Sequence, residues 1–439
     1  MPLFNLRGVH LPHKKGTSKL TPVVMPSPKT VLIPLSMHIG APATPIVKVG
    51  DTVKIGQPIA EASGYVSSKI HSSISGKIKS IDSTVLSNGK QIPSILIEND
   101  GLDEIFEEIA PPDVNSFEDF IAAIQESGIV GLGGAGFPTA VKLNVRAVDD
   151  IVINGAECEP YITSDTRTML DRTDDISFGI ELLNKWLSPK RIIFGIEKNK
   201  PECIEAISAV CADHERAFVK PLKSLYPQGG EKVLIYHATG RIVPEGKLPI
   251  DASVIVINCT TLAEIAKYIK TGMPLVKKCI TVDGGAIAEP KNVIAPIGTR
   301  INELAEFCGG LRSPAKKILL GGPMMGRAVE SAEMPVMKNT NAVLFLDEKE
   351  AHLPKETACI KCGSCANTCP LGLDPKAFVQ ALRAQDDEAL VTLKANICME
   401  CGCCSYVCPA KRQLVHTNKI AKTKAIKILN ERRKENKNG

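Results

Sequence analysis

The sequence contains two copies of one cysteine motif near its carboxyl end. The first copy, residues 359–370, reads CIKCGSCANTCP, and the second, residues 398–409, reads CMECGCCSYVCP. Both follow the spacing C-x2-C-x2-C-x3-C-P, which suits a 4Fe-4S cubane because three cysteines in one tight loop reach three of its corners. The fourth cysteine, next to the proline, then ligates the other cluster of a pair. We therefore predict an α-helical module that holds two clusters.

This crossed pattern predicts two sets of ligands. The first 4Fe-4S cluster is expected on Cys359, Cys362, Cys365 and Cys408. The second is expected on Cys398, Cys401, Cys404 and Cys369. Cys403 lies outside the spacing and is interpreted as a packed thiol. Structural zinc is one alternative, but it does not explain why a cysteine before proline recurs in both copies. A disulfide framework is typical of small secreted domains and not of a chain of 439 residues.

The composition is that of an ordinary globular chain, with 44% hydrophobic and 23% charged residues and a length that suits about three domains. Aromatic residues make up only 4%, which leaves few side chains to stack on bases and disfavours nucleic-acid binding. No apolar run approaches the roughly 18 residues of a membrane span, and the amino-terminal region lacks a signal-peptide core. We expect an intracellular protein that does not insert itself into a membrane.

Positive charge is concentrated at the carboxyl end. Residues 411–439 contain ten Lys or Arg residues against Glu431 and Glu435. We predict that residues 416–439 form a basic tail, which needs no partner if it is a solvated helix or a frayed end. Docking on an acidic protein or lipid surface is the alternative.

The first 112 residues predict an arm followed by a β domain. Residues 1–29 are rich in proline and lysine and have no apolar period, so we expect an extended arm. Residues 30–112 alternate short β-type runs with glycine turns, which predicts a small barrel or sandwich. The run VKVGDTVKIGQPIAE, residues 47–61, resembles the hammerhead of lipoyl and biotinyl carriers. Because the carrier motif is missing around Lys69, we favour a structural domain over a carrier.

A glycine-rich segment, GIVGLGGAGFPTAVKL at residues 128–143, follows a helical pattern. Its Gly131, Gly133 and Gly136 match G-x-G-x-x-G, but a standard dinucleotide fold would place a strand before the motif. Closely spaced glycines let backbone amides approach an anion, and Lys142 lies further along the predicted helix. We predict a phosphate site here, with a tight structural turn as the alternative.

The next strand ends in NGAECEP, which places Asn154, Glu157 and Glu159 where α/β sheets carry ligand groups. Strand and helix patterns then alternate, so we predict a Rossmann-like α/β domain over residues 113–254. Residues 255–345 predict a β-grasp module. It includes the glycine turn GGPMMG, residues 321–326, whose two methionines are expected in the core. A linker then leads to the helical two-cluster domain at residues 355–415.

These segments, in this order, resemble the C subunit of the Rnf electron-transport complex over essentially the whole chain. The middle third is also similar to the NADH-oxidising flavin subunit of respiratory complex I. The resemblance implies a multidomain α/β protein with an amino-terminal barrel-sandwich hybrid domain, a Rossmann-like flavin and NADH domain, an SLBB-like β-grasp module and a ferredoxin domain.

The resemblance also implies residues for two further cofactors. FMN is expected at Gly131, Gly133, Lys142, Asn154, Glu157, Gly229, Asn258 and Thr261. NADH is expected at Gly134, Phe137, Glu159 and Glu231. The chain departs from the complex I pattern at three positions. It has Leu132 in place of an arginine, Ala156 in place of an aspartate and Gly230 in place of a glutamate.

The function that the resemblance implies is electron input. NADH releases two electrons together, clusters accept one at a time, and a flavin converts between the two. The family would place the chain peripherally on the cytoplasmic side of the cell membrane, anchored by Rnf partner subunits that couple electron flow to ferredoxin and to ion translocation. The alternatives are the cobalamin reductase of propanediol-utilising microcompartments and an iron-sulfur relay subunit without a nucleotide site.

Overall fold

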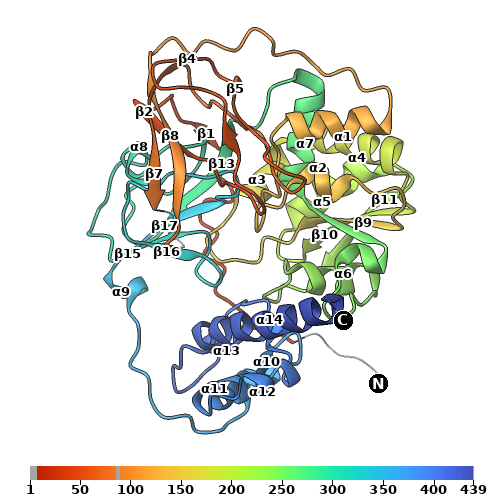
Figure 1. Ribbon diagram of the computed structural model, residues 1–439, viewed down its shortest axis with the longest axis vertical. Coiled ribbons are helices and arrows are strands. Elements are labelled where there is room, and N and C mark those ends of the chain that lie inside the picture. Colours follow the sequence, from red (N-terminus) through yellow and green to blue (C-terminus); the bar gives the residue numbers. More distant parts are fainter. Residues whose placement is uncertain (1–6, 86–88, 439) are drawn as a thin grey trace.

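The computed structural model describes residues 7–85 and 89–438. Two small β sheets form one lobe, a parallel α/β unit forms the second, a mixed sheet joins them, and a helical module lies at one end of the molecule (Figure 1). Within the described residues, no helix is long and apolar enough to cross a bilayer.

The amino-terminal β domain is built from two antiparallel sheets. One has the order β2-β8-β7-β4 and consists of β2 (Thr30–Pro34), β8 (Gln91–Asn99), β7 (Gly76–Val85) and β4 (Thr52–Val53). The other consists of β3 (Thr44–Pro45), β5 (Pro58–Glu61) and β6 (Ile70–His71). Alternate residues such as Val31 and Ile33 are fully buried, as period-two patterning requires. The ammonium of Lys69 pairs with Glu61 at 3.0 Å and Glu126 at 2.7 Å, which is not the free lysine of a carrier.

The α/β unit has four parallel strands in the order β11-β10-β9-β12. The strands are β9 (Asp150–Gly155), β10 (Arg191–Glu197), β11 (Ala217–Leu222) and β12 (Val254–Asn258). They are covered by α1 (Phe117–Glu126), α2 (Thr139–Leu143), α3 (Ser164–Asp171), α4 (Thr173–Leu187), α5 (Pro201–Ala212), α6 (Glu231–Thr239) and α7 (Cys259–Thr271). β10 is buried on both faces, as its run of apolar residues predicts.

The predicted domain boundary at residue 254 is wrong. Val254 begins β12, which pairs with β9 along its whole length, and α7 follows directly and packs on α4. A short 3-10 helix, Pro249–Ala252, precedes this strand. The α/β unit therefore continues to Thr271, and the β-grasp module starts after it.

The β-grasp module has a six-stranded sheet of order β1-β14-β13-β17-β15-β16. Its strands are β1 (Val23–Val24), β14 (Lys291–Pro296), β13 (Lys277–Asp283), β17 (Ala342–Leu346), β15 (Lys317–Leu320) and β16 (Arg327–Val329). Helix α8 (Ile301–Phe307) covers its apolar face. The edge strand β1 belongs to the predicted arm, whose described part is extended but pairs with β14.

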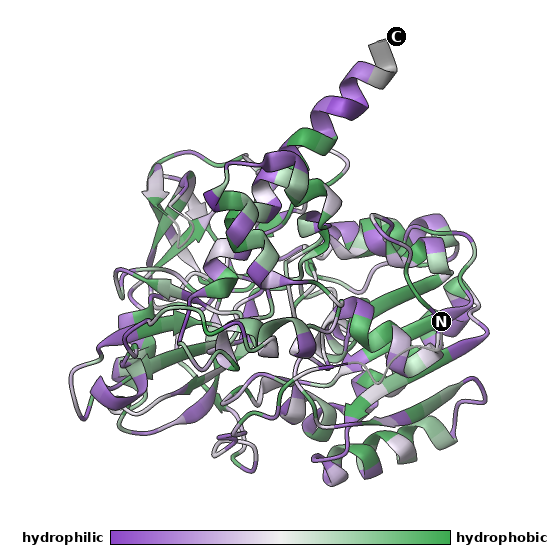
Figure 2. Cartoon of the chain, turned by 90° about the horizontal axis from the view of Figure 1, so that it is seen from below, coloured by the Kyte–Doolittle hydropathy of each residue, from purple (hydrophilic) through white to green (hydrophobic). Residues whose placement is uncertain are grey.

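The helical module follows α9 (Glu348–Ala351) and a linker. It comprises α10 (Ser364–Thr368), α11 (Pro375–Arg383), α12 (Asp387–Thr392), the 3-10 helix Ala395–Ile397, α13 (Cys403–Tyr406) and α14 (Leu414–Asn438). Ala421 and Ala425 of α14 are fully buried in the same core as Phe378 and Leu390. The predicted boundary at residue 416 is therefore wrong, because only the later turns of α14 project from the body (Figure 2).

Candidate functional site

The carboxyl ends of β9 and β12 form the centre of the candidate site. The chain leaves β9 towards β10 and β11 and returns on the other side as β12, so the sheet has its switch point between β9 and β12. Ligands of open α/β sheets bind at such a point. Asn154 and Asn258 lie opposite each other there.

The two asparagines hold the surrounding loops in place. Asn258 caps α7 because its Oδ1 accepts from the backbone nitrogens of Thr260 at 3.0 Å and Thr261 at 3.2 Å. Its Nδ2 donates to Asp165 Oδ2 at 2.7 Å. Asn154 Nδ2 donates to the carbonyl oxygen of Gly229 at 3.1 Å. The sheet edge is thereby joined to the turn that precedes α6.

The glycine loop lies against Asn258. The Leu132 nitrogen donates to Thr261 Oγ1 at 3.0 Å, and the Leu132 oxygen accepts from the buried Lys278 ammonium at 2.8 Å. A hydrogen bond of 2.8 Å from the Gly131 nitrogen to the Phe137 oxygen closes the loop. Leu132 is fully buried, so the loop is anchored at its middle residue.

Two neighbouring glycines of this loop have different surroundings. A Cβ at Gly133 would lie 2.4 Å from Asn258 Nδ2, whereas a Cβ at Gly134 would meet nothing within 4 Å. Gly133 therefore packs against Asn258, so a side chain at this position would displace the asparagine. Gly133, Gly134 and Ala135 are all exposed, so a ligand can approach the loop from this side.

Lys142 and Glu231, predicted for phosphate and for NADH, form an ion pair with each other. The Lys142 ammonium lies 3.2 Å from Glu231 Oε1 and donates to the Val256 oxygen at 3.0 Å. Both side chains are partly exposed. An incoming phosphate would compete with Glu231 for this ammonium.

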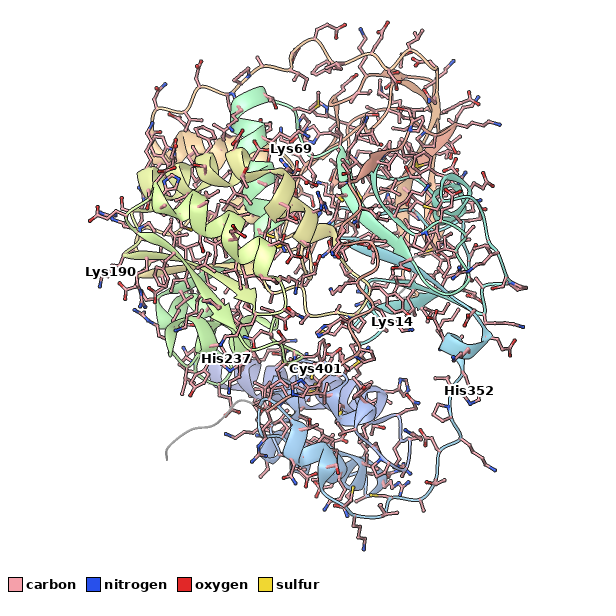
Figure 3. The ribbon with its side chains drawn as sticks, turned by 180° about the vertical axis from the view of Figure 1, so that it is seen from behind. Lys14, Lys69, Lys190, His237, His352 and Cys401 are labelled. Carbon is pink, nitrogen blue, oxygen red and sulfur yellow. The ribbon has the colours of Figure 1, made fainter. Side chains whose placement is uncertain are left out.

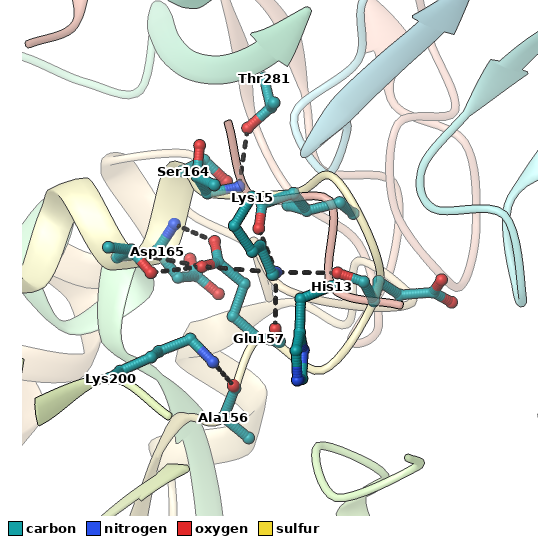
Figure 4. Close-up of polar contacts among 12 residues, drawn as sticks. His13, Lys15, Ala156, Glu157, Ser164, Asp165, Lys200 and Thr281 are labelled. Carbon is teal, nitrogen blue, oxygen red and sulfur yellow. Dashed lines mark hydrogen bonds and ion pairs between the residues drawn. The ribbon is translucent and has the colours of Figure 1, made fainter. Parts of the chain in front are cut away.

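Glu157 points away from the open side of the sheet edge. Its carboxylate accepts from the Asp165 nitrogen at 2.7 Å and from Thr166 Oγ1 at 2.6 Å at the start of α3 (Figure 4). Lys15 of the arm donates to the Glu157 and Glu159 carbonyl oxygens at 2.9 and 2.8 Å. Burial raises the pKa of the Glu157 carboxyl. Glu157 therefore fixes the loop after β9 rather than offering its oxygens to a ligand.

Glu159 is covered by the GGPMMG segment. Its carboxylate accepts from the backbone nitrogens of Met324 at 3.0 Å and Met325 at 2.8 Å, and burial raises its pKa. The prediction that both methionines belong to the core is wrong for Met325, whose side chain is about half exposed. Met324 packs in a small cluster with Tyr226, Met399 and Cys401.

The cysteines of the second motif and the crossed cysteine line one cavity. Cys369, Cys398, Cys401 and Cys404 all contribute to its wall. These four are the set that the crossed spacing predicts for the second cluster, and Cys403, which lies outside that set, also lines the cavity. Within the described residues, no three Cys, His, Asp or Glu side chains are arranged for a single metal ion.

The two cysteine loops have the same backbone shape. Lys361 and Glu400, each just before the second cysteine of its motif, have φ of 58° and 60°, and Gly363 and Gly402 just after that cysteine have φ of 78° and 80°. The copies differ in exposure. Cys359 and Cys362 are exposed, whereas Cys398, Cys401 and Cys404 are buried. The first site therefore faces the surroundings and the second faces the protein.

The second cysteine loop contacts the turn before α6. A Cβ at Gly230 would lie 2.2 Å from Met399 Cε, so the methionine side chain lies directly against the glycine. Tyr226 Oη donates to the Cys401 oxygen at 2.8 Å, and the buried Cys403 thiol donates to the Tyr226 oxygen at 3.8 Å. Cys403 is thus a packed thiol, as expected. Figure 3 shows Cys401 at the junction between the helical module and the α/β unit.

Four protein families match the chain in the order of these parts. Residues 5–102 match the RnfC barrel sandwich hybrid domain, and residues 124–267 match the Nuo51 FMN-binding domain. Residues 279–328 match the SLBB domain, and residues 358–411 match the 4Fe-4S dicluster domain. The matches confirm the predicted fold classes, and they identify FMN and iron-sulfur clusters as the cofactors of these domains.

Curated relatives cover nearly the whole chain. The C subunit of the Na(+)-translocating ferredoxin:NAD(+) oxidoreductase complex of Acetobacterium woodii is 41% identical over 98% of both chains. The C subunit of the proton-translocating counterpart from Clostridium ljungdahlii is 41% identical over 84% of this chain and 82% of its own. The C subunit of the ion-translocating oxidoreductase complex of Rhodobacter capsulatus is 39% identical over 88% and 76%.

The chain belongs to the RnfC family. It is therefore an electron-transfer subunit of an ion-translocating oxidoreductase complex, and other Rnf subunits are its partners. This assignment favours the Rnf complex over the cobalamin reductase that the sequence left open.

The residues of this RnfC-family chain fit both cofactors. The cysteine-lined cavity supplies four thiols for one cluster. At the sheet edge the exposed glycine loop and the partly exposed Lys142 ammonium can receive a phosphate, while Asn154 and Asn258 hold the surrounding loops. Sequence reasoning missed Asp165 and Lys278, which hold Asn258 and the glycine loop. No local pattern marks either residue, because each acts on a partner far away in the sequence.

Proposed function

We propose that this chain transfers electrons between NADH and its two 4Fe-4S clusters through FMN bound at the carboxyl ends of β9 and β12. In this proposal the second cluster is next to the flavin and the first cluster is the exchange point with the partner subunits. Electron exchange between ferredoxin and NAD, for which the relatives are named, is the reaction that the complex would perform. The chain would be peripheral, on the cytoplasmic side of the membrane.

One series of contacts carries the proposal. Asn154 at the sheet edge contacts Gly229, and the adjacent Gly230 lies against Met399, which stands between Cys398 and Cys401. These contacts support a short path between the cavity of the second cysteine set and the proposed flavin site. A bound flavin would supply the conversion between a two-electron and a one-electron carrier.

The residues of the sheet edge have distinct tasks in this proposal. Gly134 and the neighbouring loop backbone would receive the phosphate, and Lys142 would supply the positive charge. Asn154, Gly229, Asn258 and Thr261 would surround the ring system, and Asp165 would keep the Asn258 amide in position. Glu157 would not contact the flavin directly. It would hold the start of α3 and the loop after β9 in position.

NADH would approach from the side of Phe137, Glu159 and Glu231. In the present arrangement the Glu159 carboxylate is occupied by the Met324 and Met325 amides. Glu159 can contact the nucleotide only if the GGPMMG segment moves. We therefore assign this segment the role of covering the NADH site.

The exposure of the first cysteine set supports its role in exchange with partners. Cys359 and Cys362 are exposed, and the side chain of Ile360 between them is 66% exposed. A cluster held there would lie at the protein surface, where a redox partner can come close.

The experiment compares flavin, iron and electron input in two glycine variants. The chain is purified anaerobically, and Gly134→Val is expected to lose FMN while keeping its eight irons, because the cluster module has its own core. NADH should then no longer reduce the clusters, but dithionite should. Gly64→Val is the matched control, since Gly64 is exposed, lies in the β domain and has only Ala41 near its Cβ position, at 3.9 Å.

Two results would contradict the proposal. Wild-type flavin content in Gly134→Val would place the flavin elsewhere. A chain that carries iron but never copurifies with flavin, and whose clusters do not respond to NADH, would be an iron-sulfur relay without its own nucleotide site.

A further inference from the structure

Asn418 of α14 lies in the wall of the cavity that the second cysteine set lines. The residue is only 2% exposed. Its Nδ2 points at two of the thiols, 3.6 Å from Cys404 Sγ and 3.9 Å from Cys398 Sγ. Each distance is that of a hydrogen bond from an amide to sulfur.

The rest of this side chain indicates that its position is set by the cysteines. Asn418 Oδ1 is buried and, among the described residues, accepts no hydrogen bond. A buried acceptor without a partner costs free energy. The opposite amide orientation would point this oxygen at two sulfurs that must be thiolates when they bind iron, which is repulsive. The donor end therefore belongs on the sulfurs.

The internal repeat supplies a comparison for this position. Helices α11 and α14 begin at Pro375 and Leu414, each six residues after the last cysteine of its motif. Asn418 follows Cys408 by ten residues, and Val379 follows Cys369 by ten. The second copy thus has an amide, Asn418, that contacts the second cysteine set. The first copy has an aliphatic side chain, Val379, at the corresponding position.

We propose that Asn418 is a positioning residue that raises the reduction potential of the second cluster by donating hydrogen bonds to Cys398 and Cys404. Reduction adds negative charge, part of which resides on the ligand sulfurs, and a donor stabilises the more negative state. The first cluster lacks this donor at Val379. The inference rests on the proposed ligand sets, and it concerns the cluster itself rather than the NADH reaction.

The test is an anaerobic redox titration of the purified chain, followed by electron paramagnetic resonance with redox mediators. Asn418→Leu, which preserves the side-chain volume, should lower one of the two midpoint potentials and leave the other unchanged. We expect the ratio of reduced to oxidised second cluster at a fixed potential to fall about tenfold, which equals about 59 mV for a one-electron couple. Iron content should stay at the wild-type value.

The reciprocal variant Val379→Asn is the matched partner of this test. It should raise the midpoint potential of the other cluster, the one that Asn418→Leu leaves unchanged. If Asn418→Leu loses iron, Val379→Asn decides the question alone. The proposal is overturned if Asn418→Leu keeps its iron and both midpoint potentials are unchanged. If Asn418→Leu loses iron, unchanged midpoint potentials in Val379→Asn overturn it instead.

The titration is independent of the proposed electron route, because mediators reduce the clusters without NADH or flavin. A failure of Asn418→Leu to shift a potential would therefore contradict the role of Asn418 and not the flavin site. Failure of the ligand assignment would show itself separately, as a Cys398→Ser protein that keeps both clusters.

Discussion

Lys338 is a buried cation that joins three parts of the molecule. Its ammonium, on the segment between β16 and β17, donates to the carbonyl oxygens of Lys69 at 2.5 Å and Gly128 at 2.7 Å. The side chain is 1% exposed, and His38, His71 and Lys69 are the titratable groups nearby. Burial lowers the pKa of Lys338 to about 7.

This pKa has a consequence for stability with a definite sign. The unfolded lysine keeps its proton up to its ordinary pKa of 10.5, whereas the folded lysine loses it near 7. Between these values the unfolded chain binds more protons, so the contribution of Lys338 to the free energy of unfolding rises with pH. We expect the difference in thermal stability, wild type minus Lys338→Met, to increase from pH 7 to pH 9. A constant difference over this range would show that Lys338 does not titrate there.

Residues of the site differ in how far the sequence predicts them. The end of β9 is a local feature, and the rule for strand ends correctly places Asn154 at the sheet edge. The surroundings of Gly133 and of Glu157 depend on Asn258 and on α3, which fold against them from elsewhere in the chain. Glycine spacing alone therefore could not show that a side chain at Gly133 would meet Asn258 whereas one at Gly134 would meet open space.

At the scale of elements, α14 combines two functions that the sequence analysis separated. Its first half completes the core of the cluster module, and its basic later turns lie at the surface. The excess of positive charge predicts a tail. The burial of Ala421 and Ala425 depends on packing against α11 and α12, and the charge pattern carries no information about that packing.

Two truncations separate these functions. A chain that ends at Glu431 loses four basic residues of the last turns but keeps Ala421 and Ala425, so it should keep its eight irons. A chain that ends at Lys419 loses both alanines from the core and should lose iron, the second cluster first. Iron analysis and resonance spectra measure both. If the basic turns dock on an anionic surface, the shorter deletion should weaken membrane association at low salt only.

At the scale of the whole molecule, one cysteine of the first motif lies against the loop of the second motif. Cys369 lies in the first motif, but it lines the cavity of the second cysteine set. We expect Cys369→Ser to damage the second cluster and to spare most of the first. The measurement is iron content together with the two resonance signals. Selective loss of the first cluster would show that each motif keeps its own fourth cysteine.

The architecture as a whole follows from the sequence to different degrees. Order and type of the domains are encoded in local periodicity and in the cysteine spacing, and the family matches confirm them. The boundary at residue 254 failed because a strand added to the far side of a sheet has the same local pattern as one that starts a new domain. The contact between Met399 and Gly230, on which the proposed electron route depends, joins two domains and has no local signal.

The amino-terminal arm contacts parts of the chain that are made much later. Val9 pairs with Tyr226, β1 pairs with β14, and the Gly8 oxygen accepts from Thr368 Oγ1. On the ribosome, the arm emerges well before its last partner, which appears only when most of the residues between them have been synthesised. At about 5 to 20 residues per second, the arm waits for tens of seconds before it can dock. The arm is thus made early but can reach its final place only after the cysteine module has begun to form.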